Sequence, residues 1–115
     1  MSDLENVRSF EYRPSRMKTG FLIEFTAEEK TLHGRCLDIS AAGIRAEFEG
    51  LVVVGSSGVL ILRSPSGVLN LKADVAYAEK GFVGLVFRFR TPSERGVATR
   101  FIASVGHVAA NSKSK

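Results

Sequence analysis

The residue types with the clearest chemical use gather in one short segment, Asp38-Ile-Ser-Ala-Ala-Gly43, between two apolar runs. A carboxylate accepts hydrogen bonds from paired N–H groups, and a hydroxyl both donates and accepts them. Glycine permits either a positive φ or a close backbone approach. Asp38, Ser40 and Gly43 therefore suit a ligand that is rich in N–H donors and oxygen atoms.

Arginines form a second group of chemically useful residues. Arg8, Arg13 and Arg16 precede the first apolar run, and Arg45 stands two residues after Gly43. A guanidinium group forms forked hydrogen bonds with carboxylates and phosphates, and it stacks on planar rings. Arginines on one side and a carboxylate with a hydroxyl on the other can clamp a nucleotide.

Each group also has a purely structural interpretation. Aspartate and serine side chains readily hydrogen-bond to local backbone, so Asp38 and Ser40 by themselves could build a turn. The arginine-bearing segment could be a solvated arm without a ligand. The residues alone leave both interpretations open.

The elements that would position these residues are mainly strands. Apolar and polar residues alternate with a period of two in several short runs, separated by turns rich in Gly, Ser, Pro and charged residues. This pattern indicates an antiparallel sandwich or barrel, and closure into a barrel would remove exposed strand edges. The expected strands cover residues 21–25, 34–39, 43–48, 59–62, 69–75 and 82–89.

The last part of the chain changes to a helical period. Thr91-Pro-Ser-Glu94 has the composition of a capping box with a first-turn proline. Gly106 is expected to end the helix. We expect one amphipathic helix that packs on the sheet through residues at helical spacing, namely Val97, Ala98, Phe101, Ile102 and Val105.

Length and composition restrict the class of protein. A chain of 115 residues makes one domain, and 44% hydrophobic residues suffice for a core. Its 16 basic and 12 acidic residues give a net charge of +4, which favours anionic partners but lacks the dense basic stripe of many nucleic-acid binders. The single Cys36 excludes an internal disulfide and, with two histidines, makes no metal-binding pattern.

The sequence also bears on location. No apolar stretch is long enough to span a bilayer, and the N-terminal residues lack the basic and apolar regions of a signal peptide. We therefore expect a cytoplasmic protein without membrane insertion.

Three local patterns together resemble the PilZ domain family over roughly residues 8–105. They are Arg13-Pro-Ser-Arg16 ahead of the first strand, the D-x-S-x-x-G turn that starts at Asp38, and a late hairpin. That hairpin, Ala73-Asp-Val-Ala-Tyr77 followed by Gly84-Leu-Val-Phe87, is similar to the usual ending of the family's barrel. The order, the spacing and the following helix all fit the resemblance.

The resemblance implies an all-β fold, a six-stranded antiparallel β-barrel with one C-terminal α-helix. Together with the composition of the two ends, it leads us to expect an arginine-bearing arm at residues 1–20, the barrel with its helix at 21–106, and a disordered tail at 107–115. PilZ domains are bacterial receptors for cyclic di-guanosine monophosphate (c-di-GMP), which they hold with an R-x-x-x-R arm and the D/N-x-S-x-x-G turn. The implied ligand-binding residues are Arg13, Arg16, Asp38, Ser40, Gly43 and Arg45, with Arg8 and Tyr12 as further candidates.

The arm departs from the family pattern at one position. An R-x-x-x-R motif ending at Arg16 requires an arginine where Tyr12 stands, and Arg13 comes one residue late. The first hypothesis is therefore a non-enzymatic c-di-GMP receptor, with no other cofactor, that relays the signal to an unidentified protein partner. The alternative is a PilZ-like adaptor that does not bind the nucleotide and acts through protein contacts in motility, pilus or polysaccharide systems.

Two other classes fit less well. An oligonucleotide-binding barrel would need a row of exposed aromatic residues on adjacent strands, and the sequence shows none, so we expect no nucleic acid polymer as partner. An enzyme would need a nucleophile, a base and an orienting group, and no such set can be assembled.

Overall fold

Six of the strands close into a barrel because each carries apolar residues at every second position. The computed structural model describes residues 16–113, and side chains up to residue 105. In chain order the elements are β1 (Met17–Lys18), β2 (Leu22–Ala27), β3 (Lys30–Ile39), β4 (Gly43–Phe48), β5 (Ser57–Ser64), β6 (Gly67–Glu79), β7 (Phe82–Arg88) and α2 (Pro92–Lys113).

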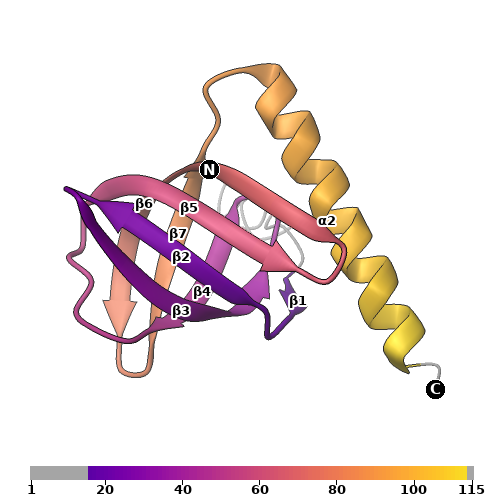
Figure 1. The fold of residues 1–115 in the computed structure, drawn as a ribbon, viewed down its shortest axis with the longest axis horizontal. Coiled ribbons are helices and arrows are strands. Elements are labelled where there is room, and N and C mark those ends of the chain that lie inside the picture. The colour runs from indigo at the N-terminus through magenta and orange to yellow at the C-terminus, as the bar shows by residue number, and fades with distance from the viewer. Residues whose placement is uncertain (1–15, 114–115) are drawn as a thin grey trace, which may run out of the picture.

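All strand pairs in the barrel are antiparallel. The order around the ring is β3-β2-β5-β6-β7-β4, and pairing between β3 and β4 closes it (Figure 1). The additional short strand β1 pairs with β3 at Met17↔Ile39 and Lys18↔Asp38. The expected six-stranded barrel is thus confirmed, and part of the expected arm forms a seventh strand against it.

The core fills the interior of the barrel. Strand β6 shows the pattern most clearly, because Leu69, Leu71, Ala73 and Val75 are buried while the residues between them lie toward solvent. Cys36 is fully buried in the same core, as a small apolar residue. Each expected apolar run therefore forms a strand, and half of the twelve strand ends extend beyond the expected bounds by two to four residues.

Two β-bulges interrupt the alternation at the same side of the barrel. The β3–β4 register shifts between Cys36 and Asp38, and the β6–β7 register shifts between Val75 and Tyr77. A bulge adds one residue to a strand and so moves the following side chains to the other face. In a regular strand, Asp38 would face inward like Cys36, and Tyr77 would face inward like Val75, because side chains two residues apart share a face. The bulges instead turn both side chains outward.

Helix α2 begins as expected and ends later than expected. The Thr91 hydroxyl accepts from the Glu94 backbone N–H at 3.2 Å, which confirms the N-cap, while the Glu94 carboxylate binds the Arg90 backbone N–H at 2.8 Å. The helix continues through Gly106 to Lys113, so residues 107–113 of the expected tail belong to it. Glycine ends a helix only where it turns left-handed, and the alanines and polar residues that follow are compatible with a helix.

The packed face of α2 lies near the barrel end that carries β1 (Figure 1). Ala98, Phe101 and Val105 are buried, as predicted from their helical spacing. The Phe101 ring meets the Phe21 ring edge to face, with ring centres 6.1 Å apart. This packing stabilises the segment that leads from β1 into β2.

Candidate functional site

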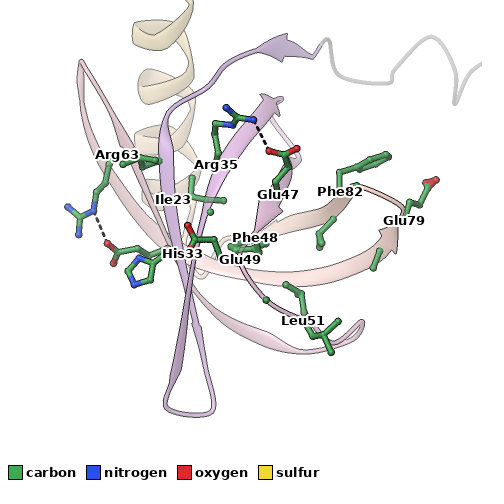
Figure 2. Close-up of a pocket in the computed structure, with 18 residues that line it drawn as sticks. Ile23, His33, Arg35, Glu47, Phe48, Glu49, Leu51, Arg63, Glu79 and Phe82 are labelled. Atoms are coloured by element: carbon green, nitrogen blue, oxygen red, sulfur yellow. Dashed lines mark hydrogen bonds and ion pairs between the residues drawn. The ribbon is translucent and has the colours of Figure 1, made fainter.

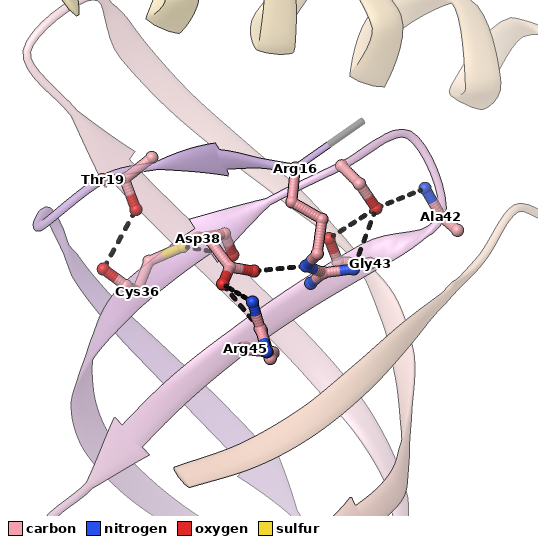
Figure 3. Close-up of polar contacts among 8 residues, drawn as sticks. Arg16, Thr19, Cys36, Asp38, Ala42, Gly43 and Arg45 are labelled. Atoms are coloured by element: carbon pink, nitrogen blue, oxygen red, sulfur yellow. Dashed lines mark hydrogen bonds and ion pairs between the residues drawn. The ribbon is translucent and has the colours of Figure 1, made fainter. Parts of the chain in front are cut away.

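The candidate site forms on the outer face of the barrel, where β1, β3 and β4 lie together (Figure 3). Asp38 pairs with Lys18 of β1 on one side and with Arg45 of β4 on the other. Because the bulge turns Asp38 outward, its side chain shares a face with Arg45. Without the bulge this carboxylate would point into the apolar core.

Asp38 binds two arginines at once. The Arg16 Nε donates to Asp38 Oδ1 at 2.5 Å. On the other oxygen, Oδ2, Asp38 accepts from Arg45 Nε at 2.7 Å and lies 2.6 Å from Arg45 Nη2. Both carboxylate oxygens are therefore occupied by guanidinium groups of this chain (Figure 3).

The electrostatics of this cluster keep Asp38 ionised. Only 7% of Asp38 is exposed, and burial alone would raise the pKa of its carboxyl group. The hydrogen bonds from Arg45 and Arg16 outweigh this effect and hold the pKa below its ordinary value. Asp38 in turn raises the pKa of Arg45. The two arginine side chains remain about one third exposed and so stay accessible to a ligand.

Ser40 lies at the turn between β3 and β4 and is buried. Its Oγ accepts from the Ala42 backbone N–H at 3.2 Å and from Arg16 Nη1 at 3.4 Å, and it donates to the Gly43 carbonyl at 3.4 Å. The Ser40 backbone N–H also donates to the Gly43 carbonyl, at 2.9 Å. The hydroxyl therefore stabilises the turn, and it also links the turn to Arg16.

Gly43 is required by the packing of the barrel. A Cβ atom at this position would lie 2.0 Å from the Leu85 carbonyl oxygen and 3.1 Å from the Val86 Cα. Gly43 is not among the residues with positive φ. Of the two roles that the sequence allowed, close backbone approach is the one that the structure uses, and the approaching backbone is that of β7.

Two aromatic residues extend the site toward β6 and β7. The Arg45 guanidinium lies over the Phe82 ring, 5.6 Å from its centre, and the Phe82 and Tyr77 rings meet at 90° with centres 6.1 Å apart. Gly84 makes room for Tyr77, because a Cβ there would lie 2.2 Å from the tyrosine ring. Carboxylate, guanidinium and aromatic rings thus follow one another across the outer face.

A small hollow of about 80 Å³ lies within this arrangement. Arg16 and the Ala42–Gly43 turn form one side, and Tyr77 with Gly84 forms the other. The hollow is open to solvent and can receive the edge of a planar ring between the Arg16 guanidinium and the Tyr77 ring. Tyr77 is 39% exposed, so its ring is accessible to such a ligand.

The structure brings together Arg16, Asp38, Ser40, Gly43 and Arg45 of the residues expected from the sequence. The other three candidates, Arg8, Tyr12 and Arg13, lie outside the described residues. Sequence reasoning did not name Tyr77 and Phe82 as site residues. The sequence could have indicated Tyr77, because an aromatic side chain in a β-hairpin often packs over a glycine on the opposite strand, here Gly84.

Other kinds of site receive no support within residues 16–105. No cluster of His, Cys, Asp and Glu able to hold a metal ion occurs among the described residues. The described part of α2 is not long and apolar enough to cross a membrane. Burial raises the pKa of the Cys36 thiol to about 11, against the lowering effect of a hydrogen bond involving Thr19, so this thiol is a poor nucleophile.

Comparison with known proteins agrees with the fold. The PilZ domain family model matches residues 7–104. The PilZ domain of YcgR from Escherichia coli with c-di-GMP is similar with a TM-score of 0.75 and 18% identity, over 90% of this chain and 97% of that chain. The PilZ domain of CeSA from a cellulose-synthesizing bacterium gives a TM-score of 0.66 and 13% identity, over 83% of this chain and 98% of that chain.

A third solved structure is PlzA from Borreliella burgdorferi in complex with c-di-GMP. Its TM-score is 0.55 with 16% identity, and the likeness covers 92% of this chain and 57% of PlzA. At such identities the structural likenesses establish the fold, not the ligand. No curated protein matches the sequence.

Proposed function

The chain belongs to the PilZ domain family, and we propose that it is a non-enzymatic receptor that binds c-di-GMP and relays this signal to a partner protein. PilZ domains are c-di-GMP receptor domains, and the match indicates no catalytic family. The observation that carries the proposal is the convergence of Arg16 and Arg45 on Asp38, beside the hollow that Tyr77 borders.

The chemistry of these groups matches the ligand. Guanine presents O6 and N7 as acceptors for a forked guanidinium, and each phosphate of the dinucleotide accepts from arginine. Guanine N1–H and N2–H₂ lie side by side and suit the two oxygens of Asp38. The Ser40 hydroxyl can bind the exocyclic amine or a phosphate oxygen, and the Tyr77 ring can stack on a purine.

Binding to Asp38 requires an exchange of partners, since Arg16 and Arg45 already occupy both of its oxygens. We expect Arg16 to be the group that leaves. It makes one short contact with Asp38 and a long one, at 3.4 Å, with the Ser40 hydroxyl, whereas Arg45 makes two short contacts with Asp38 and also lies over the Phe82 ring. A released Arg16 is then available for a phosphate or a purine face.

This exchange connects the ligand with the rest of the fold. Arg16 directly precedes β1, which pairs with β3 at Asp38. Movement of Arg16 should therefore disturb the pairing of β1 with β3. Such a change alters the surface around β1, which a partner protein can recognise. In this proposal Gly43 acts through the close approach of β7 and not through a ligand contact, and Arg13, Arg8 and Tyr12 contribute from the arm.

Isothermal titration calorimetry with c-di-GMP tests the proposal. Loss of one charge-assisted contact should cost about 1.5–3 kcal/mol, or roughly 10- to 150-fold in Kd. We expect this loss for Arg16→Ala and for Arg45→Ala. Arg63→Ala is the matched control, because Arg63 also lies on the outer face in a single ion pair, with Glu24 at 3.3 Å, but away from Asp38. Equal affinity in all four proteins would refute the site.

The adaptor is the second candidate, and Tyr12 in the place of the first arginine is the observation that favours it. An adaptor predicts no binding heat for wild-type protein at any ligand concentration that can be reached. In that case c-di-GMP should also leave the backbone amide signals of β1 and of the β3–β4 turn unchanged in NMR spectra.

A further inference from the structure

A second hollow, much larger than the one beside Tyr77, borders the candidate nucleotide site at Phe82. Its volume is about 780 Å³. It forms because β4 pairs with β7 only from Gly43 to Ala46, while β4 continues to Phe48 and the β6–β7 hairpin continues to its turn. The strands separate beyond Ala46, and the β4–β5 loop borders the space between them (Figure 2). We call this space the docking hollow.

Part of the docking hollow is apolar. Ile23 and Val83 of the core form its floor, and Phe48 and Phe82 line it while half-buried. On its rim Leu22 is 66% exposed and Leu51 is 94% exposed. An apolar surface of this kind, with leucine side chains held in solvent at its rim, is typical of a surface that a partner covers.

The charges of the docking hollow are predominantly acidic, in a chain whose net charge is +4. Arg35 is paired with Glu47 at 2.7 Å, and Arg63 with Glu24 at 3.3 Å. Two further carboxylates, Glu49 and Glu79, line the hollow and form no ion pair within residues 16–105. Glu79 contributes to raising the pKa of Arg45, but the Arg45 guanidinium is already paired with Asp38.

This charge distribution decides what can occupy the hollow. A dinucleotide carries two phosphates, so the surplus carboxylates repel it despite the size of the space. A segment with lysine or arginine beside apolar side chains places its charges at Glu49 and Glu79 and its apolar groups at Leu51 and Phe82. Strand β4 also has no strand partner on its β7 side beyond Ala46, so an extended segment can add to that edge.

We propose that the docking hollow binds an extended, cationic and apolar peptide segment of a partner protein. The hollow adjoins the candidate nucleotide site, because Phe82 lines the hollow and also lies under the Arg45 guanidinium. The docking proposal rests on the hollow alone, and it therefore holds or fails independently of c-di-GMP binding.

The first experiment selects ligands from a phage-displayed library of random dodecapeptides on immobilised full-length protein. A second round removes phage that also bind the Leu51→Ser/Glu49→Lys/Glu79→Lys variant. We expect the enriched peptides to combine lysine or arginine with leucine, isoleucine or phenylalanine. Enrichment of acidic peptides, or no enrichment over an empty surface, would overturn the proposal.

The second experiment measures Kd of an enriched, fluorescein-labelled peptide by fluorescence anisotropy. Leu51→Ser should weaken binding about tenfold or more, because a covered leucine loses its contact with the peptide. Glu49→Lys/Glu79→Lys should weaken it by about tenfold, and added salt should reduce this difference.

Two control variants carry similar changes outside the docking hollow. Val68→Ser removes an apolar side chain that is 60% exposed, and Glu29→Lys reverses a charge at the β2–β3 turn. Neither should change Kd, and equal losses in control and test variants would refute the site. Light scattering should show a monomer at the same concentrations. A dimer that Leu51→Ser dissociates would assign the hollow to a second copy of the chain and overturn the proposal.

Discussion

Replacing Gly43 with alanine distinguishes the two roles that this glycine can have in a D-x-S-x-x-G turn. The added methyl group would lie 2.0 Å from the Leu85 carbonyl oxygen, where ordinary contact distances exceed 3 Å. The carbonyl oxygen belongs to the β7 backbone, and the methyl group is fixed to the backbone of the neighbouring strand β4, so neither can move away as the end of a flexible side chain does. Strands β4 and β7 must separate by about 1 Å or more at this point.

The loss of stability that this separation causes follows from the number of residue pairs between β4 and β7. Only four residue pairs, from Gly43↔Val86 to Ala46↔Val83, join β4 to β7. Loss of two to four backbone hydrogen bonds, at roughly 1 kcal/mol each, gives a destabilisation of about 2–4 kcal/mol. For a domain of this size such a loss lowers Tm by roughly 8–20 °C.

Urea unfolding followed by circular dichroism measures this effect, with Gly20→Ala as the matched control. A Cβ at Gly20 meets nothing within 4 Å, and Gly20 is not among the positive-φ residues. Gly20→Ala should therefore be neutral or slightly stabilising, by up to about 1 kcal/mol. If Gly43→Ala unfolds at the same urea concentration as wild type and yet loses c-di-GMP affinity, the packing argument is wrong and the glycine serves the ligand.

Three further predictions concern the site and its supports. Burial raises the pKa of Asp38, but the hydrogen bonds from Arg45 and Arg16 lower it by more, so the pKa lies below its ordinary value. The ionised carboxylate therefore contributes stability that is present above this value and is lost as the pH falls through the folded-state pKa. Urea unfolding of wild type and Asp38→Asn should differ most near neutral pH, and the difference should shrink as the pH falls below the ordinary aspartate pKa. Cys36 is fully buried, and its thiol has a pKa of about 11. It should therefore resist iodoacetamide at neutral pH until urea unfolds the protein, which mass spectrometry can measure. Rapid alkylation of the folded protein would contradict the buried position. Thr91→Ala should reduce the free energy of unfolding by about 1 kcal/mol, because it removes the N-cap of α2. Thr99→Ala, inside the helix, should cause no such loss. Equal urea midpoints for the two variants would argue against the cap.

The strands and the start of the helix follow from local sequence. Alternation with a period of two reports directly which side of a strand is buried, as Leu69, Leu71, Ala73 and Val75 illustrate. Thr91 predicts its helix terminus because capping depends on residues that are adjacent in the chain. The end of the helix was predicted wrongly at Gly106, since a glycine permits a helix end without imposing one.

The sequence by itself determined which residues were candidates for the site, because the types and spacing of Arg16, Asp38, Ser40 and Gly43 are local properties. Tertiary structure alone decided where they point and what else they meet. The bulges before Asp38 and Tyr77 reverse the side that each residue faces. Their position depends on the register of paired strands that lie far apart in the chain. The same long-range pairing separates β4 from β7 and so opens the docking hollow, which no local pattern could have predicted.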